Sequence, residues 1–364
     1  MYRAIPINWA FRRWFYSVVI FVPMLISANL LAQDADGSNE AKPEKLFKSE
    51  NTLAVTLSAP WRDIVRNEEV QDPYPATIQY TDESGQPRTL PLTVERRGLT
   101  RQRVCKYPPI KLKFDKETVK GTLFRGQKSI KMVTHCDKGD RWEQYYIKEM
   151  LAYQMYNLVT DRSFRVRPLS ITYVDSEKGS TDDPRFAFLI EDDSDVAKRN
   201  DLKKLKVIEV EPDQLEPMES SRFALFQYLI GNVDWSALSG PKENKCCHNA
   251  KLIGDNEQTN IYAVPYDFDS AGIVDAHYAA PNENLPIRRV TDRLYRGFCA
   301  SNSTLPAARQ EFLALEPQIL GLVQNEPLLS KRNVRVAERY LEEFFDTLKD
   351  DSSFNKRITA KCRK

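Results

Sequence analysis

Carboxylate and carboxamide side chains of the kind that bind divalent cations follow apolar runs in the second half of the sequence. Asp234 lies in a polar loop after one such run, Asn249 precedes a short β-like run, and Asp267 ends the next one. These hard oxygen donors are the ligands that Mg²⁺ needs beside a phosphate-bearing substrate. Asn and Asp are also frequent turn formers, so either loop alone would indicate only a polar turn. Both loops in this order, joined by a predicted hairpin, favour phosphoryl transfer.

The first part of the chain is expected to position these loops on a sheet. Between residues 52 and 191, apolar and polar residues alternate over several short runs, which is typical of half-buried strands. At Ser129–Val133, Ile130 and Met132 share one face and Lys131 lies on the other. The helical period appears from Arg141 to Val159. We expect one helix there and strands at 53–57, 76–80, 89–95, 110–114, 129–133, 165–174 and 185–191.

The remainder of the chain is predicted to be mainly helical, apart from a hairpin at 250–253 and 261–264. Residues 306–323 and 331–348 carry apolar side chains at helical spacing, which predicts two packing helices. A helix-like basic stretch runs from Arg288 to Arg296. Its arginines are expected either to recognise phosphate or carboxylate or to form a solvated helix face.

Composition limits the classes of function. The chain has 364 residues, 41% hydrophobic and 29% charged, which is ordinary for a globular protein of one or two domains. The net charge of +2 gives no case for nucleic acid as a partner. With 13 Gly and no GxGxxG or GxxxxGK[ST] motif, phosphates would have to be held without a glycine-rich loop.

The N-terminus has the features of an export signal. Arg12-Arg13 precede an apolar run from Trp14 to Leu31, and small residues precede the predicted cleavage site after Ala32. The alternative is an uncleaved membrane anchor, because the run is about long enough to span a bilayer. We expect a signal peptide at 1–32, a flexible linker at 33–51 and no stable membrane span after cleavage. The protein would then act in the periplasm, the cell envelope or the extracellular space.

All six cysteines lie beyond this segment. An even number in an exported chain predicts disulfides, whose pairing cannot be derived from the sequence. Zinc binding by His135-Cys136 together with Cys246-Cys247-His248 is the alternative, although adjacent ligands lack the usual spacer. The disulfide candidates are Cys105, Cys136, Cys246, Cys247, Cys299 and Cys362.

The order of these segments resembles the CotH-type kinase-like family, the spore coat protein H group. The resemblance covers roughly residues 92–271 and rests on the Arg97-Gly98 turn, the alternating lysines at 110–114, the strand and helix after them, and the Asp234 and Asp267 loops. It implies a two-lobed, protein-kinase-like α+β fold, with a β-rich N-terminal lobe at 52–191 and a mainly helical C-terminal lobe at 192–364. It also implies ATP with Mg²⁺ or Mn²⁺ as cofactors.

The same resemblance assigns the catalytic and metal-binding roles. Asp234 takes the place of the Asp that orients the acceptor hydroxyl. Asn249 and Asp267 take the places of the metal ligands, with Asp269 ranked below them. The acceptor would be a protein or a small hydroxyl compound.

The nucleotide contacts are assigned in the same way. Lys131 takes the place of the lysine that binds the ATP phosphates, and Glu149 is its expected ion-pair partner. Lys111 and Lys113 on the preceding strand are further nucleotide-binding candidates. Alternatively, these lysines form the solvated face of a half-buried sheet.

Three functions therefore remain open. The first is an exported, ATP- and metal-dependent phosphotransferase. The second is a catalytically inactive binding protein of the cell envelope on the same scaffold. The third, a zinc hydrolase, requires His135, Cys136 and the 246–248 segment to converge.

Overall fold

Seven strands of the first half close into a barrel in the computed structural model, which describes residues 43–66, 73–98, 100–241, 246–255, 257–258 and 260–364. The order around the barrel is β1-β2-β3-β4-β5-β7-β6, and β1 pairs in parallel with β6 to close it. All other neighbouring pairs are antiparallel. The strands are β1 Leu53–Ala59, β2 Tyr74–Thr81, β3 Pro87–Arg96, β4 Ile110–Lys113, β5 Ser129–Val133, β6 Val166–Asp175 and β7 Arg185–Ile190.

The closed barrel corrects the expected fold class. The two-lobed protein-kinase-like fold is wrong: the strands do not form a β-rich lobe with a free edge but a barrel, combined with eight helices in the described residues in an α+β arrangement. Alternation in a sequence shows which face of a strand is buried, and it carries no information about whether the first and last strands meet.

The alternation itself is confirmed along most barrel strands, whereas β7 is buried continuously from Phe186 to Ile190. Ile130 and Met132 are fully buried inside the barrel, whereas Lys131 between them is only half-buried on the outer face. The strands expected at 76–80 and 89–95 are β2 and β3, which pair as a hairpin with Tyr80 opposite Arg88. The inward-facing residues form one apolar core, which includes Ile78, Val94 and Ile171.

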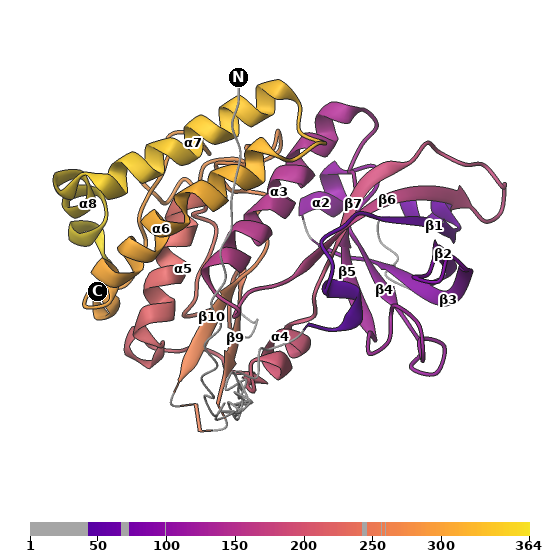
Figure 1. Cartoon of the computed structure of the whole chain (residues 1–364), viewed down its shortest axis with the longest axis horizontal. Helices are drawn as coiled ribbons and strands as arrows, with labels where there is room; N and C mark the ends of the chain where they lie inside the picture. Colours follow the sequence, from indigo (N-terminus) through magenta and orange to yellow (C-terminus); the bar gives the residue numbers. More distant parts are fainter. Residues whose placement is uncertain (1–42, 67–72, 99, 242–245, 256, 259) are drawn as a thin grey trace, which may run out of the picture. The chain divides into compact units, whose positions relative to one another are not determined.

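Helix α3 (Asp140–Val159) joins the barrel to the helical part (Figure 1), and it confirms the helix expected from residue 141. It packs against β6 and β7 on one side and against α5 and α6 on the other. Helices α6 (Leu305–Gln324) and α7 (Lys331–Lys349) match the two predicted packing helices. The remaining helices are α1 Trp61–Arg66, α2 Thr100–Val104, α4 Asp193–Arg199, α5 Pro217–Ile230 and α8 Asp351–Arg357.

A second, small sheet carries the polar loops. Strands β9 (Ala250–Gly254) and β10 (Ile261–Pro265) form the predicted antiparallel hairpin, and β8 (Lys203–Lys204) pairs with β9. Helix α5 ends at Gly231, which has a left-handed φ of 65°. A side chain at Gly231 would collide with the hydroxyl of Tyr340, so this position needs glycine for both reasons.

Two expected boundaries differ from the structure. The linker predicted at 33–51 is wrong at its end, because Leu46 and Phe47 form a short 3₁₀ helix, η1 (Lys45–Phe47), and are buried in the barrel core. Glu191, after which the second lobe was expected to begin, is buried and accepts a hydrogen bond from Arg199 Nε at 3.1 Å. Residues 41–364 form one unit.

The basic stretch from Arg288 to Arg296 is not a helix. The Asp292 carboxylate accepts hydrogen bonds from the backbone N–H groups of Arg288 and Arg289 at 2.9 and 3.0 Å, which closes a turn instead. Arg293 donates to the carbonyl of Tyr228 at 3.0 Å. At least one arginine of this stretch, Arg293, therefore stabilises the backbone at the end of α5.

Three disulfides confirm the interpretation of the cysteines. Cys105–Cys136 ties the end of α2 to the segment after β5, and Cys299–Cys362 ties the C-terminus to the start of the last helices. Cys246 and Cys247 bond to each other. Disulfides of this number are typical of proteins that fold outside a reducing cytosol. The predicted signal peptide lies outside the described residues, and among those that are described no helix is long and apolar enough to cross a membrane.

Candidate functional site

Asp234 is held at the end of α5 by a local turn. The side chain of Asn232 accepts a hydrogen bond from the backbone N–H of Asp234 at 3.0 Å. The indole of buried Trp235 donates to the carbonyl of Asn232 at 3.1 Å and packs edge-on against Phe223. The apolar neighbours of Asp234 are thus anchored, and its carboxylate remains 43% exposed.

Both oxygens of the Asp234 carboxylate have a partner from the segment before β9. His248 Nε2 lies 2.8 Å from Oδ1, and the side-chain amide of Asn249 donates to Oδ2 at 3.0 Å. Asn249 also donates to the backbone carbonyl of Asp234 at 2.7 Å. The hydrogen bond to Asp234 raises the pKa of His248. The long loop between the two segments thus brings Asn249 back to Asp234.

The β9–β10 hairpin places Asp267 beside Asp234 and Asn249. The N–H of Tyr266 donates to the carbonyl of Asn249 at 3.1 Å, and the N–H of Asp267 donates to the hydroxyl of Tyr153 at 3.0 Å. Asn249 and Asp267 both have a left-handed backbone, with φ of 48° and 62°. Residues other than glycine rarely adopt this conformation, and it is concentrated at functional sites.

The electrostatic surroundings of Asp267 suit a cation. Burial and the neighbouring Asp269 carboxylate raise its pKa to about 6. Its side chain is 38% exposed, and its ion pair with Arg101 is long, at 3.9 Å. A metal ion would offset the repulsion between these carboxylates.

Asp269, the second-ranked metal ligand, is occupied by other partners. Its Oδ2 accepts hydrogen bonds from Arg101 Nε at 2.8 Å and from the hydroxyl of Tyr278 at 3.2 Å, and its Oδ1 accepts one from Ser270 at 3.1 Å. Arg101 holds the pKa of Asp269 low despite burial. Asp269 therefore positions the loop, and Asp267 has the more accessible carboxylate.

The expected ion pair between Lys131 and Glu149 is absent from the described residues. Glu149 is 1% exposed and pairs with Arg101 Nη2 at 2.5 Å. Its burial raises its pKa to about 7. The reason is α2, a five-residue helix tethered by the Cys105–Cys136 disulfide, which brings the Arg101 guanidinium to Glu149.

Lys131 lies instead in a group of three cations around the ring of Tyr266. Its Nζ is 5.0 Å from the ring centroid, and that of Lys251 is 5.5 Å away. Arg97 donates to the Tyr266 hydroxyl at 2.9 Å. Burial, together with the positive charges of Arg97 and Lys251, lowers the pKa of Lys131 to about 8. Three cations beside Asp267 make a place for a phosphate chain.

The two lysines of β4 differ from each other. Lys111 lies directly opposite Lys131 in the β4–β5 register and has no ion pair with a described residue. Lys113 lies two residues further along the strand and forms an ion pair with Glu95. Lys111 therefore extends the row of cations on the outer face of the barrel, whereas the charge of Lys113 is already balanced.

The donors fit Mg²⁺ or Mn²⁺ rather than zinc. Mg²⁺ commonly binds one or two carboxylates and completes its shell with water and substrate phosphates. Asp267 matches that mode together with Asn249, whose Oδ1 has no hydrogen-bond partner among the described residues. Among the described residues no three His, Cys, Asp or Glu side chains converge as a closed metal cage. The zinc alternative fails because Cys136, Cys246 and Cys247 are in disulfides and His135 is packed between Tyr107 and Tyr173.

A pocket of about 240 Å³ opens beside Asp234. Ser270 and Asn282 supply polar groups to its wall. The rest of the lining is apolar and includes Val233, Pro281 and Ile287. The segment from Ala280 to Ile287 thus forms one wall of a space large enough for a small side chain.

Three basic residues of the site were not predicted to have a role there: Arg97, Arg101 and Lys251. Arg101 stands in the segment RRGLTRQR at 96–103, whose basic character was the available signal. Lys251 is the one charged residue of β9, whose other four residues are buried, and this marks it as unusual. No protein-family model matches this sequence, and no curated protein is significantly similar to it.

Proposed function

We propose that this protein is an exported, ATP- and metal-dependent phosphotransferase that acts on a hydroxyl acceptor. One observation carries the proposal: three cations surround Tyr266, the next residue is the accessible carboxylate Asp267, and Asn249 links that segment to Asp234. The order of these loops, which resembles the CotH-type family, supports the same chemistry on a different fold from the one expected.

Phosphoryl transfer requires mainly positioning and charge neutralisation. Lys131, Lys251 and Arg97 would bind the phosphate chain. Asp267 and Asn249 would hold the metal ion, which when bound neutralises charge on the transferred group.

Asp234 would orient the acceptor. The acceptor oxygen forms a bond to the γ-phosphorus while the bond from that phosphorus to the β–γ bridging oxygen breaks, and ADP leaves. The hydroxyl proton passes to Asp234, whose carboxylate His248 and Asn249 hold in place. The small pocket beside Asp234 favours a serine- or threonine-sized hydroxyl group over a bulky one.

Export is the second part of the proposal. Three disulfides and the N-terminal apolar run after two arginines support a protein that works in the periplasm, the envelope or outside the cell. N-terminal sequencing of envelope-fraction material should begin near Gln33. Full-length protein in the cytosol would contradict export.

A second function, non-catalytic ligand binding on the same cluster, is favoured by one observation. Glu149 pairs with Arg101, so Lys131 forms no direct ion pair within the described residues that would fix it against a phosphate chain. Such a protein would bind an anion without turnover.

Calorimetry of the oxidised, mature chain with ATP distinguishes the phosphotransferase from the non-catalytic binding protein. The phosphotransferase should bind ATP more tightly when Mg²⁺ or Mn²⁺ is present, and Lys131→Ala should weaken binding while the exposed Lys356→Ala, a matched control on α8, does not. Binding that is indifferent to metal supports the non-catalytic function. Absence of any ATP binding by the wild type would refute the phosphotransferase proposal.

A further inference from the structure

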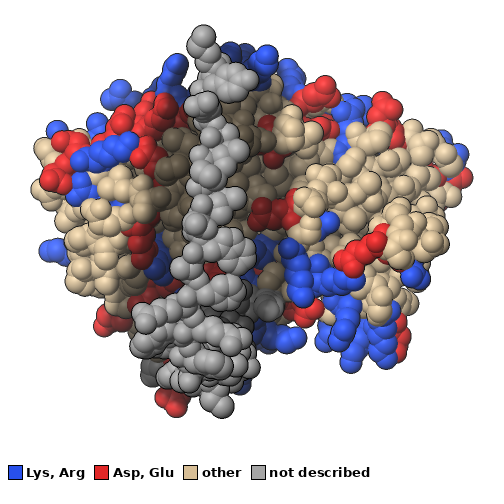
Figure 2. Space-filling model, in the orientation of Figure 1, with Lys and Arg blue, Asp and Glu red and all other residues tan. Residues whose placement is uncertain are grey.

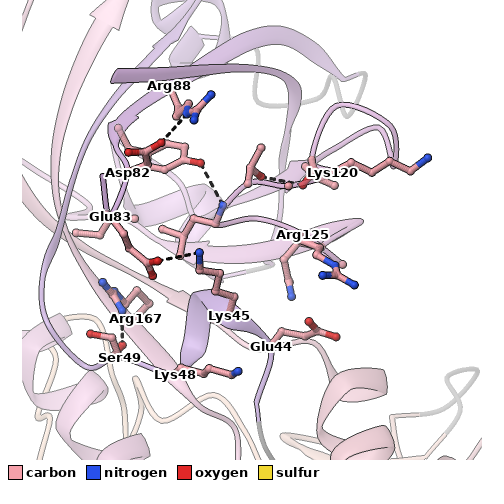
Figure 3. A pocket seen from close by; sticks show the side chains of 18 of the residues that line it. Glu44, Lys45, Lys48, Ser49, Asp82, Glu83, Arg88, Lys120, Arg125 and Arg167 are labelled. Carbon is pink, nitrogen blue, oxygen red and sulfur yellow. Dashed lines mark hydrogen bonds and ion pairs between the residues drawn. The ribbon is translucent and has the colours of Figure 1, made fainter. Parts of the chain in front are cut away.

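A second cavity, of about 1350 Å³, opens at one end of the barrel (Figure 3). Its walls come from η1, the β2–β3 turn and the connection between β4 and β5. Its floor includes Leu53 and Tyr80, which belong to the apolar barrel core. We name this cavity the basic pocket. It shares no lining residue with the cluster around Tyr266.

The basic pocket is strongly positive. Nine lysines and arginines but only three carboxylates line it, an excess of six positive charges in a protein whose net charge is +2. Figure 2 shows Lys and Arg side chains gathered over the lower edge of the barrel. Such a local concentration of one sign attracts anions and raises their concentration at the surface.

The three carboxylates do not neutralise the remaining cations. Each one already has its own partner in the pocket: Lys45–Glu83 at 2.9 Å, Arg88–Asp82 at 2.6 Å and Lys198–Glu44 at 3.5 Å. Within the described part of the chain, Lys48, Lys116, Arg125, Lys128 and Arg167 form no ion pair. Lys48 and Arg125 extend freely in Figure 3.

The burial of Arg167 indicates that the basic pocket is a binding site and not only a solvated basic surface. It has the same strand parity as Leu169 and Ile171 of β6, so it faces the barrel interior at its open end. It is only 8% exposed, yet it has no carboxylate partner. One nitrogen, Nη1, donates to the carbonyl of Ser49 at 2.6 Å, whereas Nε is buried and has no hydrogen-bond partner among the residues that the structure describes. Burying a guanidinium whose N–H group has no hydrogen-bond acceptor costs free energy, unless a bound anion accepts that hydrogen bond.

The size of the cavity defines the ligand. It exceeds the usual range of roughly 300–1,000 Å³ for small-molecule sites, so a single inorganic ion would leave most of it empty. A flat membrane surface cannot reach Arg167 at the floor. Guanidinium and ammonium groups bind tetrahedral oxyanions with charge-assisted hydrogen bonds. We propose that the basic pocket binds a compact polyanion that carries several phosphate or sulfate groups, with one of them on Arg167.

The test uses two polyanions that separate the possible sources. Oxidised, mature protein is titrated calorimetrically at 0.15 M salt with inositol hexakisphosphate and with a heparin-derived hexasaccharide, and with a glutamate hexapeptide as the carboxylate comparison. We expect saturable binding of at least one of the first two, with affinity that falls as salt rises. The tighter of the two identifies phosphate or sulfate as the natural group.

Two variants and a matched control locate the ligand. Arg167→Gln should weaken binding at least tenfold. Because this buried change could also disturb folding, Arg125→Glu with Lys128→Glu on the exposed rim provides a second variant, which should weaken binding at least as much. Arg332→Glu with Arg335→Glu makes the same charge change on exposed α7 and should alter affinity less than twofold.

The outcomes are distinct from those for the nucleotide site. Lys131→Ala should keep polyanion binding, and the rim variant should keep metal-dependent ATP binding. The proposal is overturned if no polyanion saturates the protein, if the glutamate peptide binds as tightly as both polyanions, or if the α7 control loses affinity as much as the rim variant.

Discussion

Arg101 and Glu149 form an ion pair of 2.5 Å in which the two side chains are 6% and 1% exposed. The same guanidinium binds Asp269 at 2.8 Å, so one cation neutralises two buried carboxylates. Removing one partner of such a pair leaves an uncompensated buried charge.

We therefore expect Arg101→Met to lower the free energy of unfolding by about 3–5 kcal/mol. Urea unfolding monitored by circular dichroism measures it. Arg103→Met, an exposed position on the same helix, is the control and should change stability by no more than about 0.5 kcal/mol. Equal effects of the two substitutions would show that Arg101 does not act through its carboxylate partners.

Asp234 should affect turnover more than binding. Asp234→Asn keeps the size of the side chain but removes the base, so kcat should fall on the order of 10²–10⁴-fold with nearly unchanged ATP affinity. Phosphate transfer and calorimetry on the same preparation measure the two quantities. His248→Gln should have a smaller effect on kcat, since it removes only the contact that orients Asp234. A parallel loss of ATP affinity in Asp234→Asn would contradict this role.

ATP affinity should decline as the pH rises through about 8. The pKa of Lys131 is lowered to about 8, so its positive charge is present below that pH and is lost above it. Calorimetry between pH 6.5 and 9.5 measures the effect. Lys131→Arg should move the decline to higher pH, because arginine stays protonated. A flat profile in the wild type would exclude Lys131 from phosphate binding.

Asp267→Asn should stabilise the metal-free protein near neutral pH. The pKa of Asp267 is about 6 in the folded protein against an ordinary value of 3.8, so ionisation opposes folding. The stability gain of the variant should be complete above pH 6, shrink as the pH falls from 6 towards 4, and vanish below. Thermal unfolding of the two proteins across this pH range measures the difference in stability. If the stability gain of Asp267→Asn grew as the pH fell, the prediction would be contradicted.

The Cys105–Cys136 disulfide should contribute about 3–4 kcal/mol, because it closes a loop with a sequence separation of 31. Cys105→Ser with Cys136→Ser should lower stability by that order. Cys246→Ser with Cys247→Ser is the comparison, since a bond between neighbouring residues closes no loop and removes little chain entropy. Similar losses in both pairs would argue against the loop-entropy explanation.

Local pattern predicted the elements well. Strands β2 and β3, the β9–β10 hairpin and α3 each follow from residues that are close in sequence, whose period decides between strand and helix. The presence of disulfides also followed from the even number of cysteines in a chain predicted to be exported, whereas their pairing did not.

Long-range partners could not be predicted. Closure of the barrel depends on the pairing of β1 with β6, and the sequence of neither strand indicates which strand it pairs with. The prediction that Glu149 pairs with Lys131 holds only if no other cation lies nearer to Glu149. Arg101 does lie nearer, and it belongs to a five-residue helix that is too short to be recognised from a helical period in the sequence. At the site, the order of Asp234, Asn249 and Asp267 predicted proximity, and the cations around Tyr266 came from three separate strand or turn segments.

Parallel pairing of β1 with β6 also sets an order of events during folding. The β2–β3 hairpin can form as soon as its own residues have been synthesised, but the second edge of β1 has no partner until β6 is available much later in the chain. During that interval an apolar strand edge is open to association with other chains. Pulse-labelled hydrogen exchange should therefore find β2–β3 amides protected before those of β1 and β6, and refolding yield should fall steeply with protein concentration.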